Sequence, residues 1–164
     1  MKKLYLVRHA KSSWDDYSLM DEERPLNERG KRDAPVMAQL IRDRHPGIQL
    51  LVSSPAKRAY DTAKIFRQAL DLDKKHLVKD ERLYLASPST IFSVVQKIDN
   101  KMDKVALFGH NPGLTDFLNR FSNGFVDNVP TCGVAGVDFD VENWSEIDQG
   151  TMAFFYYPKM IGLL

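Results

Sequence analysis

The stretch Leu4-Tyr5-Leu6-Val7-Arg8-His9 consists of four apolar residues followed directly by an arginine and a histidine. A short apolar run with this boundary is typical of a buried strand. Further apolar runs at 49–53, 77–78 and 105–108 alternate with segments whose apolar residues have helical spacing. Alternating strands and helices predict a three-layer α/β/α sandwich with a mainly parallel central sheet.

Four segments with helical spacing begin at a capping signal. Asn27 can cap the first of them, in which Pro35 predicts a kink or a restart. Ser54-Pro55, Ser87-Pro88 and Asn111-Pro112 each place a polar residue before a proline, the combination expected where a helix begins. The sequence therefore predicts four helices with defined first turns.

The whole chain, residues 1–164, is expected to form one domain. It has a globular composition, with 43% hydrophobic and 27% charged residues, and it contains no internal repeat or linker-like stretch. Apolar runs at 134–139 and 152–157 predict a final hairpin around 143–150. The net charge of +1 indicates neither a nucleic-acid nor a membrane partner, so phosphate binding would depend on locally placed basic groups.

Cys132 is the single cysteine of the chain and cannot form an internal disulfide, which favours the reducing cytoplasm as its location. The apolar run at the N-terminus is too short for a signal peptide, and no stretch approaches the length of a membrane span. Cys132 also lacks the glycines and the nearby downstream arginine that a catalytic thiol for phosphate chemistry needs. We therefore interpret it as a small buried hydrophobic residue.

Residues suited to phosphate binding follow the predicted strands. Arg8 and His9 follow the first strand, and His110 follows the fourth. Arg58 lies one turn into the second predicted helix, whose first turn would add backbone donors. Ligands bind at the carboxyl ends of parallel strands, and guanidinium groups match phosphoryl oxygens. These residues predict a phosphate pocket, in which Asn111 is a further candidate ligand.

The same residues suggest a reaction. A neutral imidazole at His9 can attack phosphorus in line and form a phosphohistidine, while the arginines offset the charge of the equatorial oxygens. His110, if protonated, would donate to one of those oxygens, and water would then free the phosphate. Because the cations are side chains, we expect no metal ion and no other cofactor. Inorganic phosphate, sulfate or vanadate is expected to bind in the same pocket.

Four ordered motifs span nearly the whole chain: Leu6-Val7-Arg8-His9-Ala10-Lys11-Ser12, Arg24-Pro25-Leu26-Asn27-Glu28-Arg29-Gly30, Ser53-Ser54-Pro55-Ala56-Lys57-Arg58-Ala59-Tyr60-Asp61-Thr62-Ala63 and Gly109-His110-Asn111-Pro112-Gly113. With them the chain resembles the histidine phosphatase superfamily, also called the phosphoglycerate mutase-like family, and within it the small phosphohistidine phosphatases of the SixA type. The resemblance implies that His9 is the phosphorylated nucleophile. It also implies a pocket formed with Arg8, Arg58 and His110 in an α/β/α sandwich.

The chain departs from the pattern of the larger family members at two places. Trp14 is followed by Asp15 and Asp16, where those members have an asparagine, so the phosphate-ligand role is not carried over. In the mutase-like members a glutamate after the third strand protonates the leaving oxygen, and Glu81 is the candidate for this role. A phosphoimidazole needs such a placed acid less than an ester does, since neutral imidazole leaves readily.

Three functions remain open on the sequence. The first is a phosphatase acting on protein phosphohistidine, for example on a histidine-phosphotransfer-type carrier. The second is a small-molecule phosphomonoesterase that uses the same site. The third, of another class, is a non-catalytic phosphoprotein-binding module. The short chain leaves little room for a lid, which admits a protein substrate and favours hydrolysis over a mutase reaction.

Overall fold

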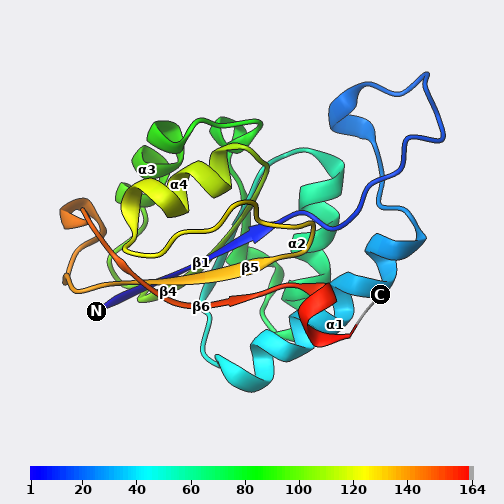
Figure 1. Cartoon of the computed structure of the whole chain (residues 1–164). Helices are drawn as coiled ribbons and strands as arrows, with labels where there is room; N and C mark the ends of the chain where they lie inside the picture. Colours follow the sequence, from blue (N-terminus) through cyan, green and yellow to red (C-terminus); the bar gives the residue numbers. More distant parts are fainter. Residues whose placement is uncertain (163–164) are drawn as a thin grey trace.

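The computed structural model describes residues 1–162, and Figure 1 shows a six-stranded sheet between two layers of helices. The strands are β1 (Lys2–Arg8), β2 (Leu50–Ser53), β3 (Leu77–Lys79), β4 (Lys104–Gly109), β5 (Val134–Phe139) and β6 (Thr151–Tyr156). Their order is β3-β2-β4-β1-β5-β6. The first four strands run parallel, while β5 is antiparallel to β1 and to β6. The predicted three-layer sandwich with a mainly parallel sheet is confirmed.

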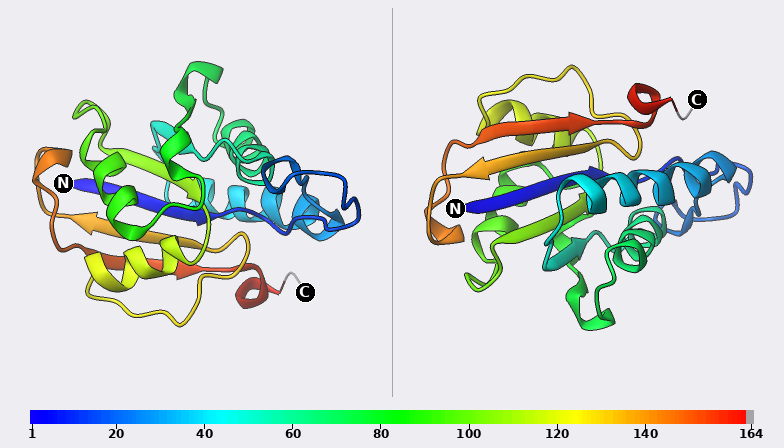
Figure 2. Two further views of the ribbon diagram at one scale, coloured as in Figure 1. Left: turned by 90° about the horizontal axis from the view of Figure 1, so that it is seen from above. Right: turned by 90° about the horizontal axis from the view of Figure 1, so that it is seen from below.

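The two faces of the sheet carry different helix pairs (Figure 2). Helices α1 (Glu28–Arg44) and α2 (Lys57–Ala69) cover one face, and α3 (Pro88–Gln96) and α4 (Gly113–Phe121) cover the other. Short 3-10 helices lie in the connections: η1 (Asp21–Glu23), η2 (Lys74–His76), η3 (Glu81–Leu83), η4 (Trp144–Glu146) and η5 (Pro158–Ile161). Within residues 1–162 no helix is long and apolar enough to cross a bilayer.

The alternation of side chains along β1 divides the apolar interior into two layers. Leu4 and Leu6 pack on the side of α3 and α4, whereas Tyr5 and Val7 pack on the side of α1 and α2. Every apolar residue of this run is buried, which is the condition of a central strand in a sheet covered on both faces. The buried strand therefore fixes the position of the residues that follow its carboxyl end.

Two of the predicted helix starts are confirmed in detail. The side chain of Asn27 accepts a hydrogen bond from the backbone nitrogen of Gly30 at 2.9 Å, and the Ser87 hydroxyl caps α3. Helix α1 runs through Pro35 without a break, so of the kink or restart expected there the restart does not occur. Pro35 is exposed, and water can therefore reach the backbone carbonyl that the proline leaves without a donor.

The start of α2 differs from the prediction. The helix begins at Lys57 with Ala56 at the N-cap, two residues later than the pair Ser54-Pro55 indicated. The Ser54 hydroxyl accepts a hydrogen bond from the backbone nitrogen of Ala56 at 3.2 Å and also contacts His110. The serine is thus used by the site and does not cap the helix. Cys132 is buried with a free thiol.

Candidate active site

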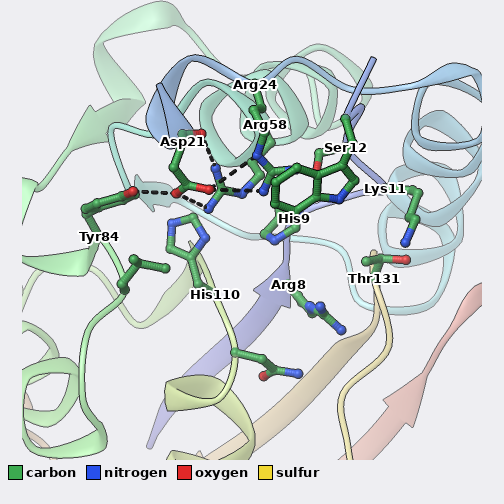
Figure 3. A pocket seen from close by; sticks show the side chains of 13 residues that line it. Arg8, His9, Lys11, Ser12, Asp21, Arg24, Arg58, Tyr84, His110 and Thr131 are labelled. Carbon is green, nitrogen blue, oxygen red and sulfur yellow. Dashed lines mark hydrogen bonds and ion pairs between the residues drawn. The ribbon is translucent and has the colours of Figure 1, made fainter. Parts of the chain in front are cut away.

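The structure gathers the predicted phosphate-binding residues around one cavity of about 380 Å³ at the carboxyl edge of the parallel strands (Figure 3). Its histidines are His9, directly after β1, and His110, directly after β4. The two rings lie 5.3 Å apart between centroids. The basic residues that line the cavity are Arg8, Lys11, Arg24 and Arg58.

His9 presents one defined nitrogen to this cavity. Its Nδ1 lies 2.8 Å from the backbone carbonyl oxygen of Ala10. A carbonyl only accepts hydrogen bonds, so Nδ1 carries the proton of the neutral ring and Nε2 keeps the lone pair. The Ala10 nitrogen in turn donates to the hydroxyl of Thr62 on α2, which fixes the turn after β1.

Burial first, and then the positive charges of Arg58, Arg8 and Arg24, lower the pKa of His9 to about 4. The hydrogen bond to the Ala10 carbonyl opposes this shift but does not cancel it. At neutral pH the ring is therefore uncharged and its lone pair is available, which is the state required of a nucleophile.

Three buried nitrogens at the cavity have no hydrogen-bond partner among the described residues: Arg8 Nε, Arg58 Nε and His110 Nδ1. The other ends of the two guanidinium groups are held in place. Arg8 Nη1 donates to the Val129 carbonyl at 3.0 Å, and Arg58 Nη1 donates to the Asp21 carbonyl at 2.7 Å. A buried donor without an acceptor is costly, so this arrangement favours an anion that accepts from these groups.

His110 is tied by its other nitrogen. Its Nε2 lies 2.7 Å from the hydroxyl oxygen of Ser54, and the ring of Tyr84 meets it edge-on at 5.6 Å. Burial first, and then the nearby His9 and Arg58, lower the pKa of His110 to about 3. The free site therefore holds His110 neutral at physiological pH, so the protonated donor considered for it is not its state there.

The structure adds Asp21 and Tyr84, which the sequence did not single out. The Asp21 carboxylate forms ion pairs with Arg24 at 3.2 Å and with Arg58 at 3.0 Å, and it accepts a hydrogen bond from the Tyr84 hydroxyl. Partial burial raises the pKa of Asp21, but the bonds from Tyr84 and Arg58 outweigh it and lower the pKa to about 2. Asp21 begins the short helix η1, which no feature of the sequence predicted. Arg24, in contrast, belongs to one of the ordered motifs.

Glu81 is not brought into the cavity. It lies on η3 with an exposed side chain, in a neighbouring hollow that it shares with Glu22 and Glu23. Within η3 the buried residue is Leu83, and Glu81 lies at the exposed start of this short helix. The expected proton donor therefore does not line the cavity, whereas Tyr84, three residues later, does.

Asn111 lines the cavity, but its side chain is engaged elsewhere. Its amide nitrogen donates to the Val129 carbonyl and to Asn128, each at 2.9 Å. Its oxygen accepts from the backbone nitrogen and the hydroxyl of Thr115. Asn111 therefore holds the start of α4 and the segment that also anchors Arg8.

The loop before α1 forms the outer rim of the cavity. The guanidinium carbon of Arg24 lies 3.5 Å from the centroid of the Trp14 ring, so the indole stacks on the arginine. Asp15 and Asp16 are exposed, and the Asp16 carboxylate accepts a hydrogen bond from Ser18. Neither of these two aspartates lines the cavity, whereas Trp14 and Arg24 both do.

The ends of the parallel strands thus place two neutral histidines among arginines, a combination suited to binding a phosphoryl anion. Residues 4–84 match the sequence profile of the histidine phosphatase superfamily (branch 1). The chain belongs to this superfamily, whose members are phosphatases or mutases.

Solved structures agree with this membership. A protein of Agrobacterium tumefaciens, provisionally assigned as the phosphohistidine phosphatase SixA, is 28% identical, with a TM-score of 0.80 over 96% of this chain and 98% of that one. The protein histidine phosphatase SixA in complex with tungstate shares the fold, with a TM-score of 0.83, 20% identity and coverage of 97% and 99%. Phosphoserine phosphatase 1 of Hydrogenobacter thermophilus is 38% identical over 87 residues, which cover 51% of this chain and 38% of that protein.

Proposed function

We propose that this protein is a phosphatase that takes a phosphoryl group onto Nε2 of His9 and passes it to water, with protein phosphohistidine as the substrate. The observation that carries the proposal is the lone-pair nitrogen of His9 in a cavity with three unpartnered buried nitrogens on Arg8, Arg58 and His110. Transfer of a phosphoryl group needs a nucleophile that can reach the phosphorus and hydrogen-bond donors around the phosphoryl oxygens.

The first step forms a bond between His9 Nε2 and phosphorus and breaks the bond from phosphorus to the leaving nitrogen of the substrate imidazole. The electron pair of the broken bond goes to that nitrogen, which takes a proton from solvent. Arg8, Arg58 and Arg24 offset the charge on the equatorial oxygens as the phosphoryl group moves. The charge is neutralised by side chains, and we propose that the reaction needs no metal ion.

In the second step, water attacks the phosphorus from the side that the leaving group has vacated. The bond from phosphorus to His9 Nε2 breaks, its electron pair returns to the nitrogen, and inorganic phosphate is released. The same arginines hold the phosphoryl group through both steps, so one set of contacts serves two transition states. An open cavity mouth gives water the access that hydrolysis requires.

The surroundings of the cavity support a protein substrate. Large apolar side chains of the cavity and of the connection between β1 and α1 have much of their surface in solvent: Trp14 is 60% exposed, Tyr17 90%, Met20 64% and Leu85 56%. Trp14 and Leu85 line the cavity, and the connection of residues 9–27, whose sequence includes Tyr17 and Met20, projects from the body of the molecule (Figure 1). A small polar ester gains little from this apolar rim, whereas a protein surface can cover it.

A second candidate, a small-molecule phosphomonoesterase, is favoured by Tyr84. Tyr84 lines the cavity, and burial together with Asp21 raises the pKa of its hydroxyl to about 12, so the hydroxyl keeps a proton, now donated to Asp21, that an alkoxide leaving group could use. The partial similarity to a phosphoserine phosphatase points in the same direction. For either substrate we propose a cytoplasmic location, which the single buried thiol of Cys132 supports.

A substrate panel tests the proposal. The protein would be incubated with a phosphohistidine-carrying protein, free phosphohistidine, phosphosugars and phosphoserine, with and without a chelator. We expect phosphate release to be fastest from the phosphoprotein and unchanged by the chelator. Faster release from an ester would favour the second candidate, and stoichiometric binding without release would favour a non-catalytic binding module.

The apolar rim gives a sharper version of the same test. Tyr17→Ser and Met20→Ser should raise KM for the phosphoprotein several-fold and leave turnover of free phosphohistidine unchanged. Phe125→Ser is the matched control, because Phe125 is 74% exposed and lies outside this loop. Equal effects of all three variants on the phosphoprotein would contradict a docking role for the rim.

A further inference from the structure

We propose that Ser54 is a positioning residue that fixes His110 as a neutral hydrogen-bond donor, with its Nδ1–H directed at the bound phosphoryl group. The inference rests on the proposed function for the identity of the bound group. It concerns a serine that the sequence assigned to a helix cap and that no step of the proposed reaction uses.

The hydrogen-bond capacity of the Ser54 hydroxyl carries the argument. The hydroxyl is fully buried, accepts from the Ala56 nitrogen at 3.2 Å and lies 2.7 Å from His110 Nε2. A hydroxyl has one proton to donate. If His110 Nε2 carried a proton, the oxygen would accept twice, and no described residue accepts the proton of Ser54 itself. If Ser54 donates to Nε2, both groups are satisfied.

The position of the proton on His110 follows from that bond. A neutral imidazole that accepts at Nε2 carries its proton at Nδ1. Nδ1 is buried and has no partner among residues 1–162, and the side chain of His110 lines the cavity beside His9 (Figure 3). An unpartnered N–H in this place costs free energy until an acceptor arrives, and a phosphoryl oxygen is such an acceptor.

The charges around His110 oppose its protonation. The groups that face it are His9 and Arg8 from the end of β1, Arg58 from α2, Asp21 from η1 and Tyr84 after η3. The arginines outnumber the one carboxylate, and Asp21 is itself occupied by Arg24 and Arg58. The site therefore obtains a hydrogen-bond donor from His110 without adding a positive charge, and this donor persists through neutral and alkaline pH.

Nuclear magnetic resonance tests the inference without any turnover. Long-range nitrogen-15 correlation spectra of the full chain at pH 7 should show His110 with a protonated Nδ1 and an unprotonated Nε2. His9 should show the same tautomer, fixed by the Ala10 carbonyl. A proton on His110 Nε2, alone or together with one on Nδ1, would overturn the proposal whether or not the enzyme acts on phosphohistidine.

Two serine variants complete the test. Ser54→Ala should mix the tautomers of His110 and weaken vanadate binding and turnover by about tenfold, the effect of one hydrogen bond. Ser53→Ala is the matched control, since Ser53 is equally buried but its hydroxyl donates to the Ser54 carbonyl and does not contact His110. If Ser54→Ala keeps one tautomer and full vanadate affinity, the proposal fails. Absence of turnover in the wild type, with the expected tautomer, would instead count against the proposed function.

Discussion

His9 and His110 are the same side chain in nearly the same setting, yet they present opposite groups to the cavity. Each follows a parallel strand directly, each is buried, and their rings lie 5.3 Å apart. His9 is bound at Nδ1 by the Ala10 carbonyl, and His110 is bound at Nε2 by the Ser54 hydroxyl. A carbonyl can only accept, whereas a hydroxyl can donate. The atom bound to each ring thus determines whether the imidazole directs a lone pair or an N–H group into the cavity.

Replacing each histidine in turn should produce the largest effects and separate their roles. His9→Ala should abolish the phosphoenzyme and lower turnover by at least about 1,000-fold, because it removes the nucleophile. His110→Ala should slow the reaction by about 100-fold and still leave a phosphoenzyme that can be trapped, since only a donor is lost. Rapid quenching with radiolabelled substrate measures both. An acid-labile phosphoenzyme in His9→Ala would contradict the assignment.

Arg58→Gln should lower kcat/KM by about 100-fold, because a guanidinium group that contacts the phosphoryl oxygens is lost. It should also raise the pKa of both histidines, since the charge of Arg58 lowers each of them. Arg67→Gln is the control, because Arg67 lies on the same helix and its guanidinium donates to the Leu72 carbonyl. Equal losses in the two variants would point to damage of α2 and not to the phosphoryl contact.

We expect an effect of intermediate size on the titration of the two histidine rings and on the stability of the fold. Carbon-13 titration without phosphate should place the midpoint of His9 near pH 4 and that of His110 near pH 3, both below the ordinary value of 6.5. The unfolded chain then binds more protons than the folded one, so the free energy of unfolding should fall as pH drops from about 6.5 towards these values. Urea unfolding at pH 7 and pH 5 checks the direction. A midpoint near 6.5 for either ring would contradict its burial among cations.

Asp21→Asn should have the smallest effect and act on the two rings unequally. The Asp21 carboxylate raises the pKa of His110, so its removal should lower that pKa further and leave the midpoint of His9 nearly unchanged. Vanadate should bind a few-fold more tightly, because Arg58 loses a competing anion. Asp16→Asn, on the same loop and away from the cavity, is the control. Weaker vanadate binding in Asp21→Asn would show that the carboxylate mainly holds Arg58 in place.

Much of the fold followed from local pattern. The apolar runs predicted all six strands, and the polar residues before the helices predicted two caps in detail, at Asn27 and Ser87. The start of α2 could not be predicted in the same way. Ser54 has the residue type of a cap, but its hydroxyl is engaged by the Ala56 nitrogen and by a histidine 56 positions further along the chain. Propensity describes neighbours in sequence and carries no information about such a partner.

The candidate site likewise contains residues that could be predicted from the sequence and residues that could not. Arg8, His9, Arg58 and His110 were predicted to converge, because the ends of parallel strands share one edge of the sheet, and the structure brings all four to one cavity. Glu81 was expected near them because mutase-like family members have a glutamate after the third strand, but in the structure it is exposed on η3 and does not line the cavity. Asp21 was not predicted, since its loop reaches the cavity only through contacts made in three dimensions.

The side chains at the carboxyl ends of the parallel strands could be predicted from the sequence, because the spacing of apolar residues indicates where each strand runs and where it ends. Which nitrogen each histidine presents to the cavity could not be predicted in this way. That choice depends on a carbonyl oxygen 2.8 Å from His9 and a hydroxyl oxygen 2.7 Å from His110. Ser54 lies 56 positions before His110, and the turn that directs the Ala10 carbonyl at His9 is held by Thr62 of α2, so both contacts depend on segments that are distant in sequence.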